Sequence, residues 1–244
     1  MSLDRLRYEI RVMGKRVILT PILVMIGVAL FAELLHYQHV DPARFLSSSL
    51  EMILPVAAGV IVATIASHDP AIELQLTVPS IYHITAVLRL FLIFTLMVCI
   101  ALLSSSVIAL FKLGYMPEPI PSWSAPLQFL TGQLTWLAPL LWFVAVGLCL
   151  ALLLRSRSAS AALLGSIWLV ETLFKDYIAA TNWLRPVFLF PTTLLPLVGP
   201  LPQTIFDMWL VNRIELIGIA LILLTLGWIL LHNSEGLLKG SSEE

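Results

Sequence analysis

The feature that most constrains the fold of this chain is a series of six long apolar stretches. The hydrocarbon core of a bilayer is about 30 Å thick, and a helix needs roughly 20 apolar residues to cross it. Water is absent at that depth, so backbone polar groups must bond within each segment, which selects helices. The fifth and sixth stretches are short and need flanking residues to complete a span. The stretches cover residues 17–36, 46–66, 86–111, 127–154, 159–174 and 214–231.

Composition supports one membrane domain and little else. The chain is 59% hydrophobic and 12% charged, about half the charge of a soluble domain. No hydrophilic region is long enough for a separate catalytic domain, so residues 1–244 are predicted to form a single all-α, polytopic transmembrane domain. Cys99 and Cys149 both fall inside apolar stretches, without the spacing of a disulfide or metal site. We see no cleavable signal peptide.

The distribution of Lys and Arg predicts the orientation, because cytoplasmic loops are enriched in both. Nine basic residues fall on the side of the N-terminal tail and five on the opposite side. Both termini are therefore predicted to lie in the cytoplasm, with the chain as a multi-pass protein of the inner or plasma membrane. The nine are Arg5, Arg7, Arg11, Lys15, Arg16, Arg89, Arg155, Arg157 and Lys239, and the five are Arg44, Lys112, Lys175, Arg185 and Arg213.

Residues 1–16 have the pattern of a basic amphipathic helix. Their apolar residues recur at alternating intervals of three and four, and charged residues fill the other face. Such a helix just ahead of a span is expected to lie in the cytoplasmic headgroup layer. It can act as a membrane anchor alone, or it can also contact a cytoplasmic partner, and the pattern leaves both readings open.

The loop at 67–85 has the signals of a short helix between the second and third spans. Ser67 or Asp69 can cap it, and Pro70 suits its first turn. Pro79 ends it, and a new helix begins just beyond. We therefore expect a short helix across the cytoplasmic face, although the periodicity is equally compatible with an ordinary turn.

Residues 175–212 combine dense prolines with an apolar composition. Prolines this frequent forbid a regular spanning helix, and the many Leu, Phe and Val residues are unsuited to a fully solvated loop. We predict short helical pieces that dip into the outer leaflet, where irregular backbone is tolerated only if it is buried in protein or lines a cavity. The prolines are Pro186, Pro191, Pro196, Pro200 and Pro202.

Four acidic residues, Glu33, Glu51, Glu171 and Glu215, lie in or at the ends of apolar stretches. Intramembrane carboxylates are costly and are candidate functional groups. We predict that Glu51 and Glu171 line an outward-facing polar path. The alternative is local pairing, since Lys175 follows Glu171 by four residues, the favourable order for a helix ion pair.

Motifs for catalysis are absent from the sequence. We find no phosphate-binding G-x-x-x-x-G-K-[ST] loop, no G-x-S-x-G elbow and no H-E-x-x-H helix. The histidines lie near span ends or in loops rather than at mid-span, which argues against haem ligation. We expect neither enzymatic activity nor a bound cofactor or metal.

The order of these features along the chain is informative. A basic amphipathic N-terminal helix, six spans, a cytoplasmic helix between spans two and three and a broken apolar segment before the last span follow one another. In the loop after span two, Glu73, Pro79-Ser80 and Arg89 stand in that order. This layout resembles the permease subunit of type-2 ATP-binding-cassette (ABC) exporters, whose loop carries an acidic residue, a short helix, a Pro-Val-Ser-like step and a basic residue. Leu74-Gln75 stand where that family often has a glycine.

The resemblance implies a division of labour. Residues from Asp69 to Ser80 would form a coupling helix that docks, through residues such as Pro70 and Glu73, into a separate ABC ATPase subunit, with the helix at 1–16 contacting the same partner. Two permease chains, identical or paralogous, would assemble with two ATPases that bind the ATP and Mg²⁺. ATP would drive the change between inward-facing and outward-facing states through its different affinity for the two.

The apolar character of the chain indicates an amphipathic substrate: a drug-like compound, a lipid, a lipid-linked glycan or a peptide. Membrane lipids are expected contacts, and nucleic acid is not. A secondary transporter driven by an ion gradient is the alternative function, although it would usually place charged residues near the midplane. An intramembrane enzyme would need a constellation of catalytic residues at one depth, which the sequence does not supply.

Overall fold

The computed structural model describes residues 9, 13–67, 82–111, 123–195 and 201–232, and every element in these ranges is helical. Five helical stretches are long and apolar enough to cross a membrane. The prediction of an all-α, multi-pass membrane fold is therefore confirmed at this level. Most of the predicted amphipathic helix at 1–16 and the whole predicted coupling helix lie outside the described residues. The five stretches are Val17–Tyr37, Ala43–Ser67, Thr85–Leu110, Ala125–Leu154 and Gln203–His232.

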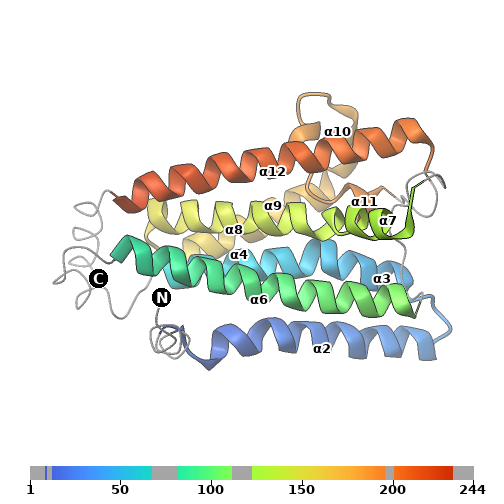
Figure 1. The fold of residues 1–244 in the computed structure, drawn as a ribbon, viewed down its shortest axis with the longest axis horizontal. Coiled ribbons are helices and arrows are strands. Elements are labelled where there is room, and N and C mark those ends of the chain that lie inside the picture. Colours follow the sequence, from blue (N-terminus) through green and yellow to red (C-terminus); the bar gives the residue numbers. More distant parts are fainter. Residues whose placement is uncertain (1–8, 10–12, 68–81, 112–122, 196–200, 233–244) are drawn as a thin grey trace.

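The long helices lie side by side along one axis (Figure 1). The start of α2, the start of α6 and the end of α12 are at one end of this bundle, and the short helices α7, α10 and α11 are toward the other. The long helices are α2 (Lys15–Tyr37), α4 (Leu54–Ser67), α6 (Tyr82–Leu110), α8 (Leu134–Leu154), α9 (Arg157–Leu173) and α12 (Gln203–His232). The shorter elements are α3 (Ala43–Ser48), η1 (Ser49–Ile53), α7 (Ala125–Gly132), α10 (Lys175–Ala180), η2 (Arg185–Val187) and α11 (Pro191–Leu194).

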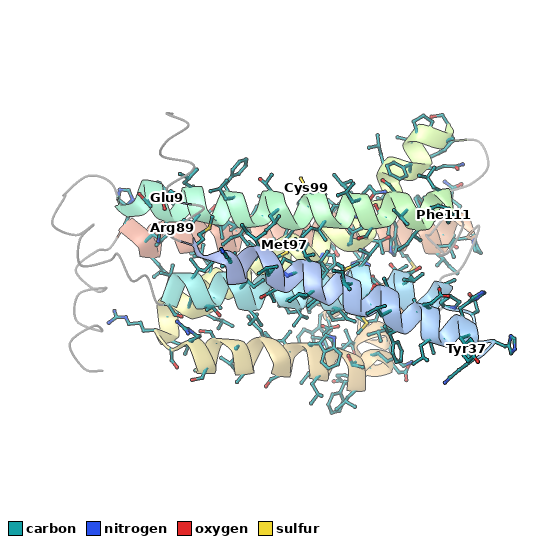
Figure 2. All side chains as sticks on the ribbon, turned by 90° about the horizontal axis from the view of Figure 1, so that it is seen from below. Glu9, Tyr37, Arg89, Met97, Cys99 and Phe111 are labelled. Atoms are coloured by element: carbon teal, nitrogen blue, oxygen red, sulfur yellow. The ribbon has the colours of Figure 1, made fainter. Side chains whose placement is uncertain are left out.

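Helix α8 forms the centre of the bundle. It is apolar all round, as expected of a helix surrounded by others, and its main neighbours are α4, α12 and α9. Most of α8 and α4 is buried within the chain, whereas α2, α6 and α12 expose most of their apolar surface (Figure 2). In a membrane protein that exposed surface is available to lipid or to another membrane chain.

Two glycines allow α4 and α8 to approach closely. A Cβ atom added at Gly147 would lie 2.5 Å from the carbonyl oxygen of Gly59, and one added at Gly59 would lie 2.8 Å from the carbonyl oxygen of Phe143. Small residues at a helix crossing are the usual route to tight packing in lipid. Because Glu51 stands on the element that leads into α4, this crossing fixes its position relative to α8.

Helix α9 covers nearly the same residues as the predicted fifth stretch at 159–174. Its 17 residues give a helix of about 26 Å at 1.5 Å per residue, which is slightly shorter than the bilayer core of about 30 Å. It packs along α4 and α8. The count of six spans therefore stays a prediction.

The last long helix begins at Gln203, earlier than the apolar stretch that was expected to start near Ile214. Pro202 is the final proline of the chain, and nothing after it prevents a helix. The polar residues between Pro202 and Ile214 are compatible with a helix because several of them, Arg213 above all, are buried against the broken segment that precedes α12.

Candidate functional site: a buried ion-pair network

The chain between α9 and α12 is folded as three short helices, and prolines begin two of them. Pro186 is in the first turn of η2 and Pro191 is in that of α11, where a missing N–H costs nothing. These pieces leave backbone groups that no long helix can satisfy. The residues that bond to these groups form the candidate site.

Glu51 is positioned by a π-helical turn. Residues 43–67 run as one helical stretch in which η1 interrupts the α-helix, and the N–H of Leu54 bonds to the carbonyl of Ser49. Pro55 explains the interruption, because a proline ring clashes with the carbonyl four residues earlier, here that of Glu51 itself. Single π-turns of this kind occur often at functional sites.

The Glu51 carboxylate forms an ion pair with Arg213 of α12, and both side chains are 0% exposed. It also accepts hydrogen bonds from the backbone N–H groups of Thr192 (3.1 Å) and Thr193 (2.6 Å). One carboxylate thus compensates the charge of Arg213 and satisfies two backbone N–H groups of α11 that have no partner within that short helix. Three parts of the chain that are far apart in sequence meet at this group.

Arg213 extends the network on the other side of the pair. Its guanidinium donates to the carbonyl of Leu189 (2.9 Å) and to Oγ1 of Thr192 (3.0 Å). The indole N–H of Trp209 donates to the same Thr192 hydroxyl (2.9 Å), and the guanidinium carbon lies 5.6 Å from the centre of the Trp209 ring. This cation–π contact and the hydrogen bonds hold a charge that would be very costly alone in the membrane interior.

Two further side chains fasten the broken segment. Asn212 donates from Nδ2 to the carbonyls of Arg185 (2.6 Å) and Phe188 (3.2 Å). The buried carboxyl of Glu171, on α9, accepts a hydrogen bond from the N–H of Leu189 (3.3 Å). Lys175 forms no ion pair with Glu171 in this structure, so the local pairing considered from their spacing is not what holds this acid.

The predicted path residues therefore lie in one place. Glu51 contacts the broken segment at α11, and Glu171 contacts it at the backbone N–H of Leu189. Glu51 is enclosed by its partners in the single chain, and Glu171 is nearly so. Their role in lining a transport path stays a prediction.

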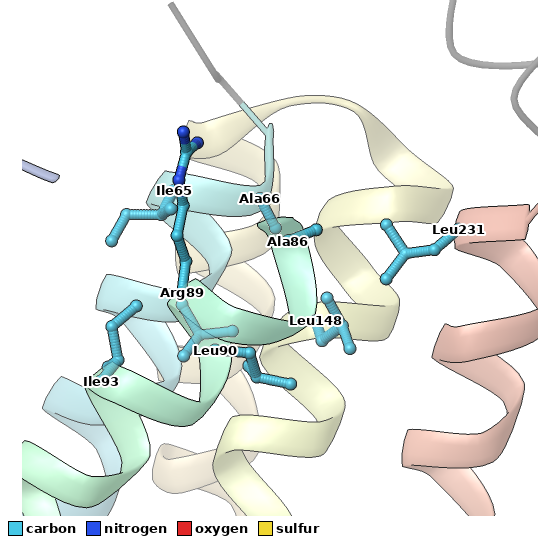
Figure 3. Close-up of a pocket in the computed structure, with 9 residues that line it drawn as sticks. Ile65, Ala66, Ala86, Arg89, Leu90, Ile93, Leu148 and Leu231 are labelled. Carbon is cyan, nitrogen blue, oxygen red and sulfur yellow. The ribbon is translucent and has the colours of Figure 1, made fainter. Parts of the chain in front are cut away.

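A second buried ion pair lies at the opposite end of the bundle. Glu9 and Arg89 of α6 lie beside each other at this end (Figure 2). Arg89 donates from Nε to a carboxylate oxygen of Glu9 at 2.7 Å, and both side chains are about 5% exposed or less. Arg89 also borders a small cavity of about 30 Å³ together with Ile65, Leu148 and Leu231 (Figure 3). Glu9 is thus attached to the first turns of α6.

Of the residues assigned to the coupling helix and to the basic position that follows it, only Arg89 is described. Its guanidinium is buried against Glu9 rather than presented on the surface. Asp69, Pro70, Glu73, Pro79 and Ser80 lie outside the described residues.

Sequence reasoning missed the residues that complete the network. Arg213 was assigned to an outer loop, and Thr192, Trp209 and Asn212 were given no polar role. The signal that could have found Arg213 is that charged residues within the membrane usually pair with one another. A carboxylate within one apolar stretch, here Glu51, therefore predicts a cationic partner within or beside another apolar stretch. Among the described residues, no group of three or more His, Cys, Asp or Glu side chains is arranged to hold a metal ion.

Comparisons with models of known protein families, with curated proteins and with solved structures gave no match for this chain.

Proposed function

We propose that this chain is the membrane-spanning subunit of an ATP-driven exporter of the type-2 ABC class, which moves an amphipathic substrate out of the cytoplasm. In this proposal α9 is the fifth of six crossings, both termini are cytoplasmic, and the segment from α10 to α11 lies on the outer side. A separate ATPase subunit hydrolyses ATP, and a second permease chain completes the path.

The observation that carries the proposal is the pair of connections at the two ends of α4. One end of the stretch η1–α4 holds Glu51, which bonds to α11 and α12. The other end, Ser67, leads directly into the loop to which we assign the coupling helix. The 14 residues of α4 span about 21 Å at 1.5 Å per residue. A displacement of the loop would therefore be passed by a single helix to the broken segment.

The ion pair of Glu9 and Arg89 supports the same mechanism from the other side of the loop. The loop ends at α6, and Arg89 on the first turns of α6 is bonded to the N-terminal segment. In the proposed complex, that segment and the loop would contact the same ATPase. The movements of the N-terminal segment and of the loop would then be coupled through the buried Glu9–Arg89 ion pair.

Purification of the tagged chain from its native membranes tests the proposal. We expect an ATP-hydrolysing protein with a phosphate-binding loop to co-purify. The Glu73→Arg variant should lose this subunit or its coupled ATPase activity. The control is Glu33→Arg, which changes an exposed acid near the C-terminal end of α2 and should keep both. Full assembly and coupling in Glu73→Arg would contradict the coupling-helix assignment, and the absence of any such partner would contradict the proposed function.

A secondary transporter is the second candidate, and the Glu51–Arg213 pair is the observation in its favour. Ion-coupled transporters often place charged residues where helices are broken within the membrane, and this pair contacts such a segment. Uptake or efflux by vesicles that contain the chain alone, driven by a proton or sodium gradient without nucleotide, would favour this candidate.

A further inference from the structure

A half-open cleft lies beside the network, between the broken segment and the first part of α12. Its volume is about 170 Å³, and Phe188, Leu195, Ile205 and Met208 form most of its apolar wall. This is close to the size of an engineered apolar cavity of about 150 Å³ that binds benzene. The cleft therefore has room for a short stretch of hydrocarbon, and a longer chain would extend from it into the surroundings.

The cleft opens onto the apolar face of α12. Ile205 is 41% exposed and Met208 is 53% exposed at its edge. At 3.6 residues per turn the same side of the helix continues through Val211, Ile222 and Leu226, which are also exposed apolar residues. Because this face belongs to a candidate membrane span, hydrocarbon chains of the bilayer have direct access to the cleft.

A cation stands on the border of the cleft. Arg185 of η2 is exposed, and its Nε donates to the carbonyl of Ala179 (3.2 Å). No carboxylate among the described residues forms an ion pair with it, in contrast to Arg213 nearby. An exposed guanidinium with free donors is well suited to a phosphate oxygen pair.

The wall of the cleft also contains a buried acceptor. Asn212 is 8% exposed, and its amide nitrogen is used by the carbonyls of Arg185 and Phe188. Its Oδ1 has no hydrogen-bond partner within the part of the chain that the structure describes. Buried acceptors are normally satisfied, and a hydroxyl group of a ligand in the cleft can supply the missing donor.

We propose that the cleft binds one anionic phospholipid with a hydroxylated head group, of the phosphatidylglycerol type. The acyl chain lies against the apolar wall at Phe188 and Met208, the phosphate pairs with Arg185, and a head-group hydroxyl donates to Asn212. The lipid comes from the leaflet that surrounds this end of the bundle. This site is independent of the transport function proposed above, because it is contained in a single chain.

Photocrosslinking tests the site on the full chain in detergent micelles. The probe is phosphatidylglycerol with a diazirine in one acyl chain, and peptide mapping by mass spectrometry locates the adduct. We expect adducts on residues 185–195 and 203–212. Unlabelled phosphatidylglycerol should reduce the yield strongly, whereas equal amounts of phosphatidylcholine or of soluble glycerol phosphate should not. Equal competition by phosphatidylcholine, or competition by glycerol phosphate alone, would overturn the proposal.

Paired variants separate the two parts of the site. Met208→Trp should fill the cleft and remove most of the adduct, whereas Val211→Trp, with the same 53% exposure but outside the cleft, should not. Arg185→Gln should weaken competition by phosphatidylglycerol about fivefold, which is the effect of one basic residue near an anionic lipid. The control is Arg157→Gln, which changes an exposed arginine at the start of α9 and should have no effect on competition. Arg185 lies at the surface, so its variant stays informative if Met208→Trp misfolds. An unchanged adduct yield in Met208→Trp, or unchanged competition by phosphatidylglycerol in Arg185→Gln, would overturn the site.

Discussion

Replacement of Glu51 by glutamine is the sharpest test of the buried network. The carboxylate accepts two backbone N–H bonds and pairs with Arg213. The amide of Glu51→Gln keeps one acceptor oxygen and turns an NH₂ group toward donors, and Arg213 loses its counter-charge. Removal of one partner from a buried ion pair costs about 3–5 kcal/mol. At about 2–4 °C per kcal/mol for a chain of this size, the melting temperature should fall by about 6–20 °C.

The assay is thermal unfolding in a mild detergent, followed by size-exclusion chromatography of the heated samples. Glu215→Gln is the matched control, because this exposed acid stands two residues after Arg213 on the same helix and should change stability by no more than about 0.5 kcal/mol. The double variant Glu51→Gln/Arg213→Gln should be less destabilised than the sum of the single variants, because the uncompensated charge is gone. A melting temperature for Glu51→Gln equal to that of Glu215→Gln would refute the assigned role of the pair.

Two further predictions concern the rest of the bundle. Gly147→Ala should destabilise the protein by about 1–3 kcal/mol, because its new methyl group would overlap the carbonyl of Gly59. Gly165→Ala is the control and should not destabilise the protein, since Gly165 has open space around it. Equal melting temperatures for the two variants would contradict the close crossing of α4 and α8. Glu9→Gln should release the N-terminal segment from Arg89 and accelerate tryptic cleavage ahead of α2, and an unchanged cleavage rate would show that the ion pair does not hold this segment.

The long helices were predictable because lipid imposes one strong requirement on the sequence. A run of apolar residues without charge has to be a helix at membrane depth, and the stretches at 17–36, 86–111 and 127–154 correspond closely to α2, α6 and α7–α8. The final helix was predicted too short because the hydropathy of its first turns is low. In the structure, Trp209 and Arg213 of these turns are buried by tertiary contacts and do not belong to a loop.

The site was predictable only in part. Glu51 and Glu171 stand out because a carboxylate in an apolar stretch is conspicuous, but their partners are mainly backbone groups of the broken segment. Backbone donors carry no signature in the sequence, and Arg213 had seemed to belong to a loop. Pro55 was a visible sign of an irregular turn at Glu51, and the interaction of Glu9 with Arg89 across 80 positions has no local pattern that could reveal it.

The proposed function is that this chain supplies a membrane gate and obtains its energy from a separate ATPase. It is tested most directly by measuring ATP hydrolysis of the assembly purified with the tagged chain, before and after the chain is separated from its partner and returned to lipid vesicles. We predict that the assembly hydrolyses ATP and that the separated chain neither hydrolyses nucleotide nor moves a fluorescent phospholipid across the vesicle membrane. Movement of that lipid by the chain alone, without nucleotide or partner, would contradict the account.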